Sequence, residues 1–225
     1  MKTKQAGFTL VEIAIVLVII GLLLGGILKG QEMIIQAKVK NSLTDFSGVS
    51  AAFYGYQDRY RAIPGDDPGA TRWTGATVSS GGTNIPGDCV LTGLYNSATD
   101  TDETREWWDH LRRSGFVTGA SGFTQPINSF NGMLGVQQGD GAGTGNTAPG
   151  PVLGAAGVGF TNLMLCSTAL PDKVAIALDV QMDDGVPTTG AVRSILQPTA
   201  ATLSTAASAS YLETGTNMYT ICRQF

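Results

Sequence analysis

Hydrophobic residues dominate the first part of the chain almost without interruption. The 21 residues from Phe8 to Leu28 carry a single charge, on Glu12. A helix of this length is roughly 30 Å long at 1.5 Å per residue, about the thickness of the hydrocarbon core of a membrane. Residues 8–30 are therefore predicted to form a helix that is apolar on every side and suited to a membrane.

After residue 30 the apolar positions become periodic. They recur every three or four residues, which is typical of an amphipathic helix with one buried stripe. We expect this helix to cover residues 31–62, because Pro64 disfavours helical backbone at Ile63 and the segment "PGDDPG" is rich in turn residues. The stripe, whose aromatic residues we interpret as core, comprises Val39, Leu43, Phe46, Val49 or Ser50, Phe53, Tyr56 and Tyr60.

Residues 63–225 show only short patterns and are predicted to form a globular head. Residues 65–102 lack sustained periodicity, so we expect an irregular loop with room for one short strand. The glycine-rich stretch 119–159 predicts surface loops that flank short strands such as "FNGMLGVQ". A second helix is predicted over residues 102–115, with an apolar face and capping residues at both ends. Trp107, Trp108 and Leu111 form that face, and His110, the only histidine, is expected on the helix surface.

The segment "KVAIALDVQMDDGVPTTGAVRSI" gives the strongest strand signal. Val174, Ile176 and Leu178 alternate with other residues, the "DDG" segment favours a turn, and "GAVRSI" is placed to return as a hairpin partner. The predicted fold class is therefore α+β. It combines a long N-terminal helix with a head that contains an antiparallel sheet, a second short helix and long glycine-rich loops.

Three aspartates surround that turn and are candidate metal ligands. Asp179, Asp183 and Asp184 offer carboxylate oxygens, which suit a hard cation such as Ca²⁺. Turn chemistry accounts for them equally well, because aspartate favours turns by accepting hydrogen bonds from nearby backbone N–H groups. Both interpretations remain open at this point.

Composition and charge exclude several classes of function. Only 14% of the 225 residues are charged and the formal net charge is −4, which argues against a dedicated duplex-DNA binder. The 30 glycines suit a loop-rich domain outside the cytoplasm. HExxH and GxSxG motifs are absent, "GAGTGN" lacks the Lys-Ser/Thr of a P-loop, and neither a CxxC pair nor a second histidine supports zinc binding. We therefore expect neither an enzyme nor a resident cofactor, apart from the candidate calcium.

The order of residues before the apolar run is unlike that of a secretory signal peptide. Lys2 and Lys4 keep the N-terminus cytoplasmic by the positive-inside bias. A signal peptide is cut at small residues after its apolar core. Here the small residues, Ala6 and Gly7, come before that core.

This order, together with the stretch "AGFTLVEIAIVLVIIGLLLGGILKGQ", resembles the class III leader and first helix of type IV pilins and type II secretion pseudopilins. The resemblance implies that residues 1–7 are a leader, which a prepilin peptidase removes between Gly7 and Phe8. It further implies that the new Phe8 amine is methylated and that Glu12 serves filament assembly. The implied partners are further copies of the chain in a helical homopolymer, the assembly platform, and the inner membrane before assembly.

A lone carboxylate in such a helix needs a partner or a use. An ionised side chain inside a bilayer costs roughly 2.5 to 3.5 kcal/mol or more. In a filament the Phe8 amine of an incoming subunit is a suitable cation for Glu12, and the pair would set the register of the helices more than their stability. The alternative is that Glu12 reaches the membrane edge. Many pilins also carry a proline after this run, whereas "LGGILKGQ" has none, so both a continuous helix and local melting at glycines stay open.

The three cysteines, Cys89, Cys166 and Cys222, allow three single disulfides in an oxidising compartment. The resemblance favours Cys166 with Cys222, because many pilins tie a C-terminal segment to the sheet in this way. It also supports calcium, which some pseudopilins bind near their sheets.

Three functions follow from the sequence. The first is a structural subunit of an extracellular pilus, and the second a pseudopilin or minor pilin of a periplasmic secretion machine. The third is a single-pass anchored binding domain, in which the leader pattern is a coincidence.

Overall fold

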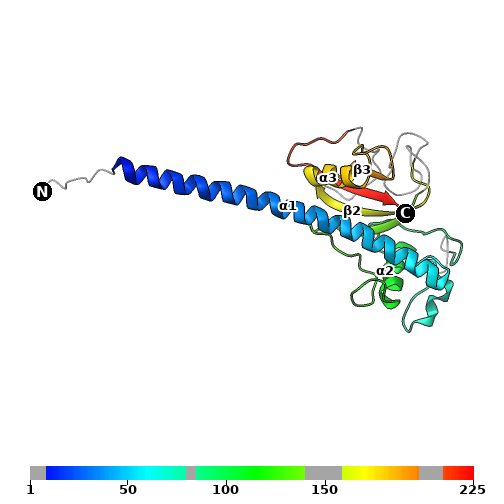
Figure 1. Ribbon diagram of the computed structural model, residues 1–225. Helices are drawn as coiled ribbons and strands as arrows, with labels where there is room; N and C mark the ends of the chain where they lie inside the picture. The colour runs from blue at the N-terminus through cyan, green and yellow to red at the C-terminus, as the bar shows by residue number, and fades with distance from the viewer. Residues whose placement is uncertain (1–8, 80–84, 140–158, 198–209) are drawn as a thin grey trace. The chain divides into compact units, whose positions relative to one another are not determined.

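The structure is a computed structural model that describes residues 9–79, 85–139, 159–197 and 210–225. These residues contain three α-helices, one short 3-10 helix and a four-stranded sheet (Figure 1). This combination confirms the predicted α+β class. The helices are α1 (Leu10–Tyr60), η1 (Pro68–Arg72), α2 (Glu103–Arg113) and α3 (Asp172–Met182), and the strands are β1 (Leu134–Gln138), β2 (Leu163–Pro171), β3 (Val192–Leu196) and β4 (Met218–Gln224).

Helix α1 is continuous over 51 residues. It passes through Gly21, Gly25, Gly26 and Gly30 without a break, so these glycines are helical in the single subunit. Chain contacts divide the protein into two compact units, one through Lys38 and one from Val39 onward. Each unit is described by itself below.

The second half of α1 supplies one wall of the core of the head. The predicted stripe is confirmed, since its members from Val39 to Tyr56 are buried, apart from Leu43, which is half-buried like Tyr60. The Phe53 ring lies 4.8 Å from the ring of Phe225 and 6.5 Å from that of Trp107, measured between centroids. This part of α1 therefore packs between α2 and the end of the sheet, as Figure 1 shows.

The sheet is antiparallel throughout, with the strand order β1-β2-β4-β3. Its central strands are β2 and β4, in which Cys166 and Cys222 are direct partners and form a disulfide. This is the pair that the resemblance implied. Cys89, the third cysteine, is exposed and has a free thiol.

The predicted hairpin over residues 174–195 is wrong in its first half. Residues 172–182 form helix α3, and β3, the expected return strand, pairs with β4 instead. The buried residues of α3 are spaced by three or four positions, which is the helical period; they include Ala175, Leu178 and Asp179. The alternation of Val174, Ile176 and Leu178 coexists with that spacing over only 11 residues, and the tertiary contacts decide for the helix.

The loops before α2 are irregular, as expected, but they cover its polar face. Residues 65–79 and 85–102 contain η1 and no strand. Buried carboxylates of α2 accept hydrogen bonds from these loops: Glu103 from the N–H of Thr92, and Glu106 from the N–H of Ser79. The prediction that His110 lies on the helix surface is wrong, because this side chain is fully buried under the same loops.

Candidate functional site

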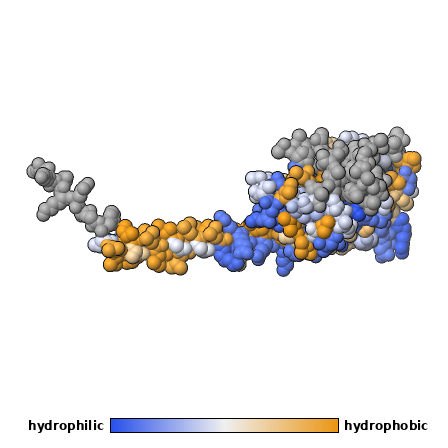
Figure 2. Space-filling view, turned by 90° about the horizontal axis from the view of Figure 1, so that it is seen from above, coloured by the Kyte–Doolittle hydropathy of each residue, from blue (hydrophilic) through white to orange (hydrophobic). Residues whose placement is uncertain are grey.

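The first half of α1 is an apolar surface that the described chain leaves uncovered. Its large apolar side chains from Leu10 to Leu28 are between 46% and 90% exposed. Figure 2 shows this part of the helix as an almost unbroken hydrophobic surface. By length and composition, α1 is a helix that can cross a membrane. A surface of this size needs an apolar environment that the chain itself does not supply.

Glu12 lies in the first turn of α1 and caps the helix. Its Oε2 accepts hydrogen bonds from the N–H and the hydroxyl of Thr9, both at 2.8 Å, while the N–H of Glu12 donates to the Thr9 hydroxyl at 3.3 Å. This reciprocal arrangement is a capping box, in which two otherwise unpaired N–H groups are satisfied. The sequence signal, Thr-x-x-Glu before an apolar run, was readable but overlooked.

The capping box leaves the charge of Glu12 in place, because Thr9 contributes only neutral donors. The predicted cleavage point between Gly7 and Phe8 lies outside the described residues. The described part of the predicted assembly site is thus one carboxylate, that of Glu12, at the start of an exposed apolar helix.

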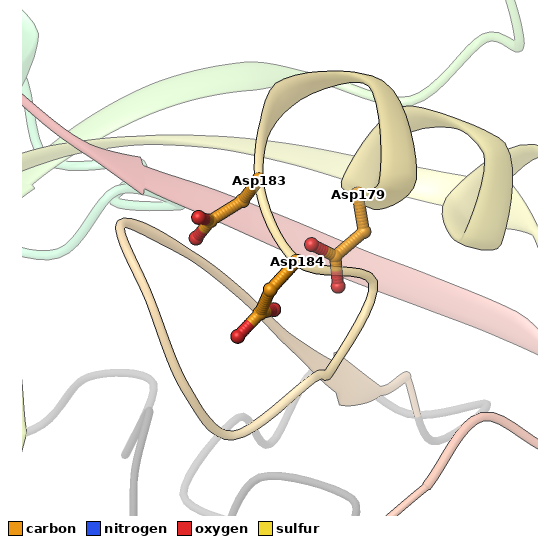
Figure 3. A group of neighbouring side chains, drawn as sticks. All are labelled: Asp179, Asp183 and Asp184. Carbon is orange, nitrogen blue, oxygen red and sulfur yellow. The ribbon is translucent and has the colours of Figure 1, made fainter.

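The second candidate site is the aspartate group, which the structure brings together. Asp179 lies in the last turns of α3, and Asp183 and Asp184 follow the end of that helix. One carboxylate oxygen from each lies within 4.8 Å of the others (Figure 3). Asp179 is fully buried, whereas Asp183 and Asp184 are exposed or close to it.

Backbone N–H groups account for one carboxylate oxygen of Asp183 and one of Asp184, and the Thr189 hydroxyl donates to the other oxygen of Asp184. Asp183 accepts from the N–H of Val192 at 2.9 Å, and Asp184 from the N–H of Val186 at 2.8 Å. The Val192 bond closes part of the outer edge of β3, a common protection for an edge strand. A Cβ at Gly190 would collide with the Asp183 carboxylate, so glycine is required for this close approach. Turn chemistry therefore explains Asp184, and the bond to β3 explains Asp183.

Turn chemistry does not explain Asp179. Its Oδ2 accepts from the Tyr211 hydroxyl at 2.6 Å, but its buried Oδ1 has no hydrogen-bond partner of good geometry in the described chain. Burial raises the pKa of Asp179, and the negative charges of Asp184 and Asp183 raise it further. Hydrogen bonds from the Tyr211 hydroxyl and the Gly185 amide lower it, but by less. A buried acceptor without a donor is costly. The three residues therefore fit a hard cation, which would neutralise the repulsion and occupy the unpartnered oxygen.

A third polar cluster, around His110, was missed by the sequence analysis. Nδ1 of His110 accepts from the N–H of Gly65 at 2.8 Å, so Nε2 carries the proton and donates to the carbonyl of Thr77 at 2.9 Å. Burial lowers the pKa of His110, although Glu106, Asp67 and Asp109 oppose the shift. The imidazole has no free nitrogen for catalysis or for a metal ion. It holds two loop segments on α2.

Asp67 is the second anchor of these loops. It accepts from the Tyr56 hydroxyl at 2.6 Å, from Arg72 at 2.7 Å and from the N–H of Gly69 at 2.8 Å. Burial alone would raise its pKa, but these three donors, led by Arg72, hold it below the ordinary value. The polar atoms of His110 and Asp67 described above are all hydrogen-bonded, and their partners lie in the loops or the helices that they join. This cluster therefore has a structural role.

Comparison with known proteins adds one match. Residues 2–28 match the family model described as the prokaryotic N-terminal methylation motif. No curated protein and no solved structure matches the chain. Family evidence is therefore concentrated in the same short segment that holds the exposed apolar helix and Glu12.

Proposed function

We propose that this protein is a structural, non-catalytic subunit of a type IV pilus-like surface filament. The proposal starts from the class III leader of type IV pilins and pseudopilins, which the chain carries. A prepilin peptidase removes the leader between Gly7 and Phe8. The first half of α1 anchors the subunit in the inner membrane and afterwards packs against copies of itself in a helical homopolymer outside the cell.

The observation that carries this proposal is the exposure of the apolar half of α1. Roughly 25 cal/mol is gained for each Å² of apolar surface removed from water, so many exposed side chains strongly favour a covered state. A bilayer covers the helix of a single subunit, and a bundle of identical helices covers it in a filament. The same surface thus serves both stages.

Glu12 gives the assembly its register. At the helix start in a membrane, Thr9 and interfacial water solvate the carboxylate. In a dry bundle of helices an unpaired carboxylate is costly, and the Phe8 amine is the cation that every processed subunit brings to this depth. Pairing between neighbouring subunits therefore fixes the axial step.

The test uses Glu12→Ala in cells that lack the wild-type copy, with Glu32→Ala as the matched control. Glu32 lies on α1 beyond the apolar run and forms an exposed pair with Lys29 at 2.7 Å. We expect Glu12→Ala to reduce sheared surface filaments at least tenfold while processed protein accumulates in the membrane, and Glu32→Ala to assemble normally. Normal filament yield from Glu12→Ala would refute this role of the carboxylate.

The same experiment separates the alternatives. Processed wild-type protein that stays in the periplasmic fraction, absent from sheared filaments, would indicate a pseudopilin or minor pilin of a secretion-like machine. An intact mass that retains residues 1–7 would indicate a simple membrane-anchored binding domain.

The aspartate group supports a second proposal, a structural calcium site in the head. Asp179 Oδ1 is the observation that favours it, because this buried oxygen has no hydrogen-bond partner of good geometry among the described residues. Ca²⁺ bound by Asp179, Asp183 and Asp184 would hold the end of α3 to the segment before β3, and so stabilise the sheet edge.

Calcium titration with thermal unfolding tests this site. A ligand present at 100 times its dissociation constant stabilises the folded state by about 2.7 kcal/mol. We expect Ca²⁺ to raise the unfolding temperature of the wild type and to leave Asp179→Asn unchanged, with Asp58→Asn, an exposed change on α1, as the control. Equal responses of wild type and Asp179→Asn would exclude the site.

A further inference from the structure

An open pocket of about 510 Å³ lies beside the C-terminal end of α2. The chain after the helix folds back over the Arg112 side chain to form it. The lining contains one charged residue, three hydroxyl residues and no carboxylate. It consists of Arg112, Val117, Thr118, Gly119, Ala120, Ser121, Gly122, Thr124 and Pro126.

Arg112 provides a half-buried cation without a counter-ion. Its guanidinium donates to the carbonyl oxygens of Gly122 and Thr124, both at 2.5 Å. The nearest acid in sequence, Asp109, is already engaged by the Arg113 guanidinium at 2.6 Å and by the N–H of Gly122 at 2.7 Å. In the described ranges Arg112 forms no ion pair, and the groups it binds directly are the two carbonyl oxygens.

Burial makes that charge costly. Loss of water around the guanidinium lowers the pKa of Arg112, and Asp109 opposes the shift only in part. A negatively charged group in the pocket would therefore gain more from Arg112 than from an exposed arginine, since water screens the latter.

Several other polar groups of the lining are donors without a partner in the described chain. The hydroxyls of Thr118, Ser121 and Thr124, and the N–H groups of residues 118–121, make no hydrogen bond to any part of the chain that the structure describes. Hydroxyls and N–H groups around a cation favour an acceptor-only ligand. The lining itself contains no carboxylate, and the neighbouring Asp109 carboxylate is engaged by Arg113 and by the N–H of Gly122.

We propose that this pocket binds a small oxyanion group, phosphate or carboxylate, with Arg112 as its counter-ion. The proposal is independent of filament assembly, because it concerns only the head. It also differs from the aspartate site, which selects cations.

NMR titration of the ¹⁵N-labelled full chain in zwitterionic micelles tests it. Sodium phosphate and sodium acetate are added separately, with sodium chloride keeping the ionic strength constant. We expect saturable shifts of the amides from Thr118 to Gly122, and the tighter of the two probes identifies the preferred group. Arg112→Gln should weaken binding at least tenfold. Arg61→Gln removes the same charge from an exposed side chain and should leave binding unchanged.

A second variant guards against misfolding of Arg112→Gln. Ser121→Asp keeps Arg112 and its two carbonyl bonds but places a carboxylate in the lining, so it should also abolish anion binding. Three results would each overturn the proposal: no saturable shift in the wild type, shifts identical to those with chloride alone, or full binding by Ser121→Asp. The first would show that Arg112 only fastens the loop to α2.

Discussion

The two halves of α1 have the same secondary structure and opposite surroundings. In the first half, Leu22 is 74% exposed and every large apolar side chain is similarly open to solvent. In the second half, Phe46 is 1% exposed and the apolar stripe is buried in the head. The difference arises from how apolar residues are distributed around the helix: all round in one half, on one face in the other. A single stripe can be covered by the rest of the chain, whereas a helix that is apolar on every side needs other molecules.

This comparison predicts its largest effect at Phe46. Phe46→Ala should lower the free energy of unfolding of the head by about 3 to 5 kcal/mol, because a large buried ring is replaced by a cavity. Denaturant unfolding followed by fluorescence of the buried Trp107 and Trp108 measures it. Leu22→Ala is the matched control in the first half and should leave the head unchanged. An equal loss in both variants would contradict the division of α1.

The disulfide is a second difference between the head and the first half of α1, because it cross-links the sheet of the head covalently. Cys166 and Cys222 close a loop with a sequence separation of 56 between the two central strands. Replacing both cysteines by serine should destabilise the head by about 2 to 5 kcal/mol. The measurement is the same denaturant unfolding, and membrane anchoring by the first half of α1 should be unaffected. Non-reducing peptide mapping that joins Cys89 to either residue would show a different pairing.

The parts of this fold that were predictable carry long or specific patterns. The 51 residues of α1 offered enough turns for two distinct hydrophobic patterns, and the leader pattern lies in the segment that matches the N-terminal methylation motif, residues 2–28. Helix α3 offered only 11 residues, in which alternation and helical spacing coexisted, and packing on the sheet decided between them. His110 was misplaced because its burial depends on loops distant in sequence, which contact it through Gly65 and Thr77.

His110 makes the stability of the head depend on pH, because it holds two loop segments on α2 and is buried there. Its pKa is lowered from 6.5 by burial, so the unfolded chain binds the proton more readily than the folded head. Stability from this group is complete above about pH 6.5 and falls on acidification, with a slope of at most about 1.4 kcal/mol per pH unit for one proton. Burial raises the pKa of Asp66 and Glu103, which gives the opposite trend at lower pH.

Denaturant unfolding between pH 7.5 and 5.5 isolates the histidine term. The stability of the wild type should fall more steeply than that of His110→Gln, since the contributions of Asp66 and Glu103 are common to both proteins. The first half of α1 has no part in this response, so its amide protection factors, which allow for the intrinsic pH dependence of exchange, should not change over the same range. Parallel stability profiles of the two proteins would show that His110 does not titrate on unfolding.

The candidate sites were predictable in residue type more than in geometry. The sequence identified Asp179, Asp183 and Asp184 as a cluster around a turn. Only the structure shows that Asp179 lies near the end of a helix and that its Oδ1 has no hydrogen-bond partner in the described chain. Arg112 lies in the last turn of α2, and its pocket arises from the later chain that folds over it. Such sites depend on where an irregular loop returns, which no local pattern records.

The smallest predicted effect is at Thr9, where the first half of α1 makes a polar contact of its own. Thr9→Ala removes the hydroxyl that accepts from the N–H of Glu12 and donates to its carboxylate. Loss of an N-cap side chain costs about 1 kcal/mol, so amide hydrogen exchange of residues 10–13 in micelles should quicken about fivefold. Thr9→Ser keeps a hydroxyl and should exchange like the wild type, and the head should unfold at the same denaturant concentration in all three proteins. Unchanged exchange in Thr9→Ala would mean that the carboxylate of Glu12 is solvated without its neighbour. Faster exchange would show that, before any second subunit is present, this apolar helix depends on its own capping box to begin at Leu10.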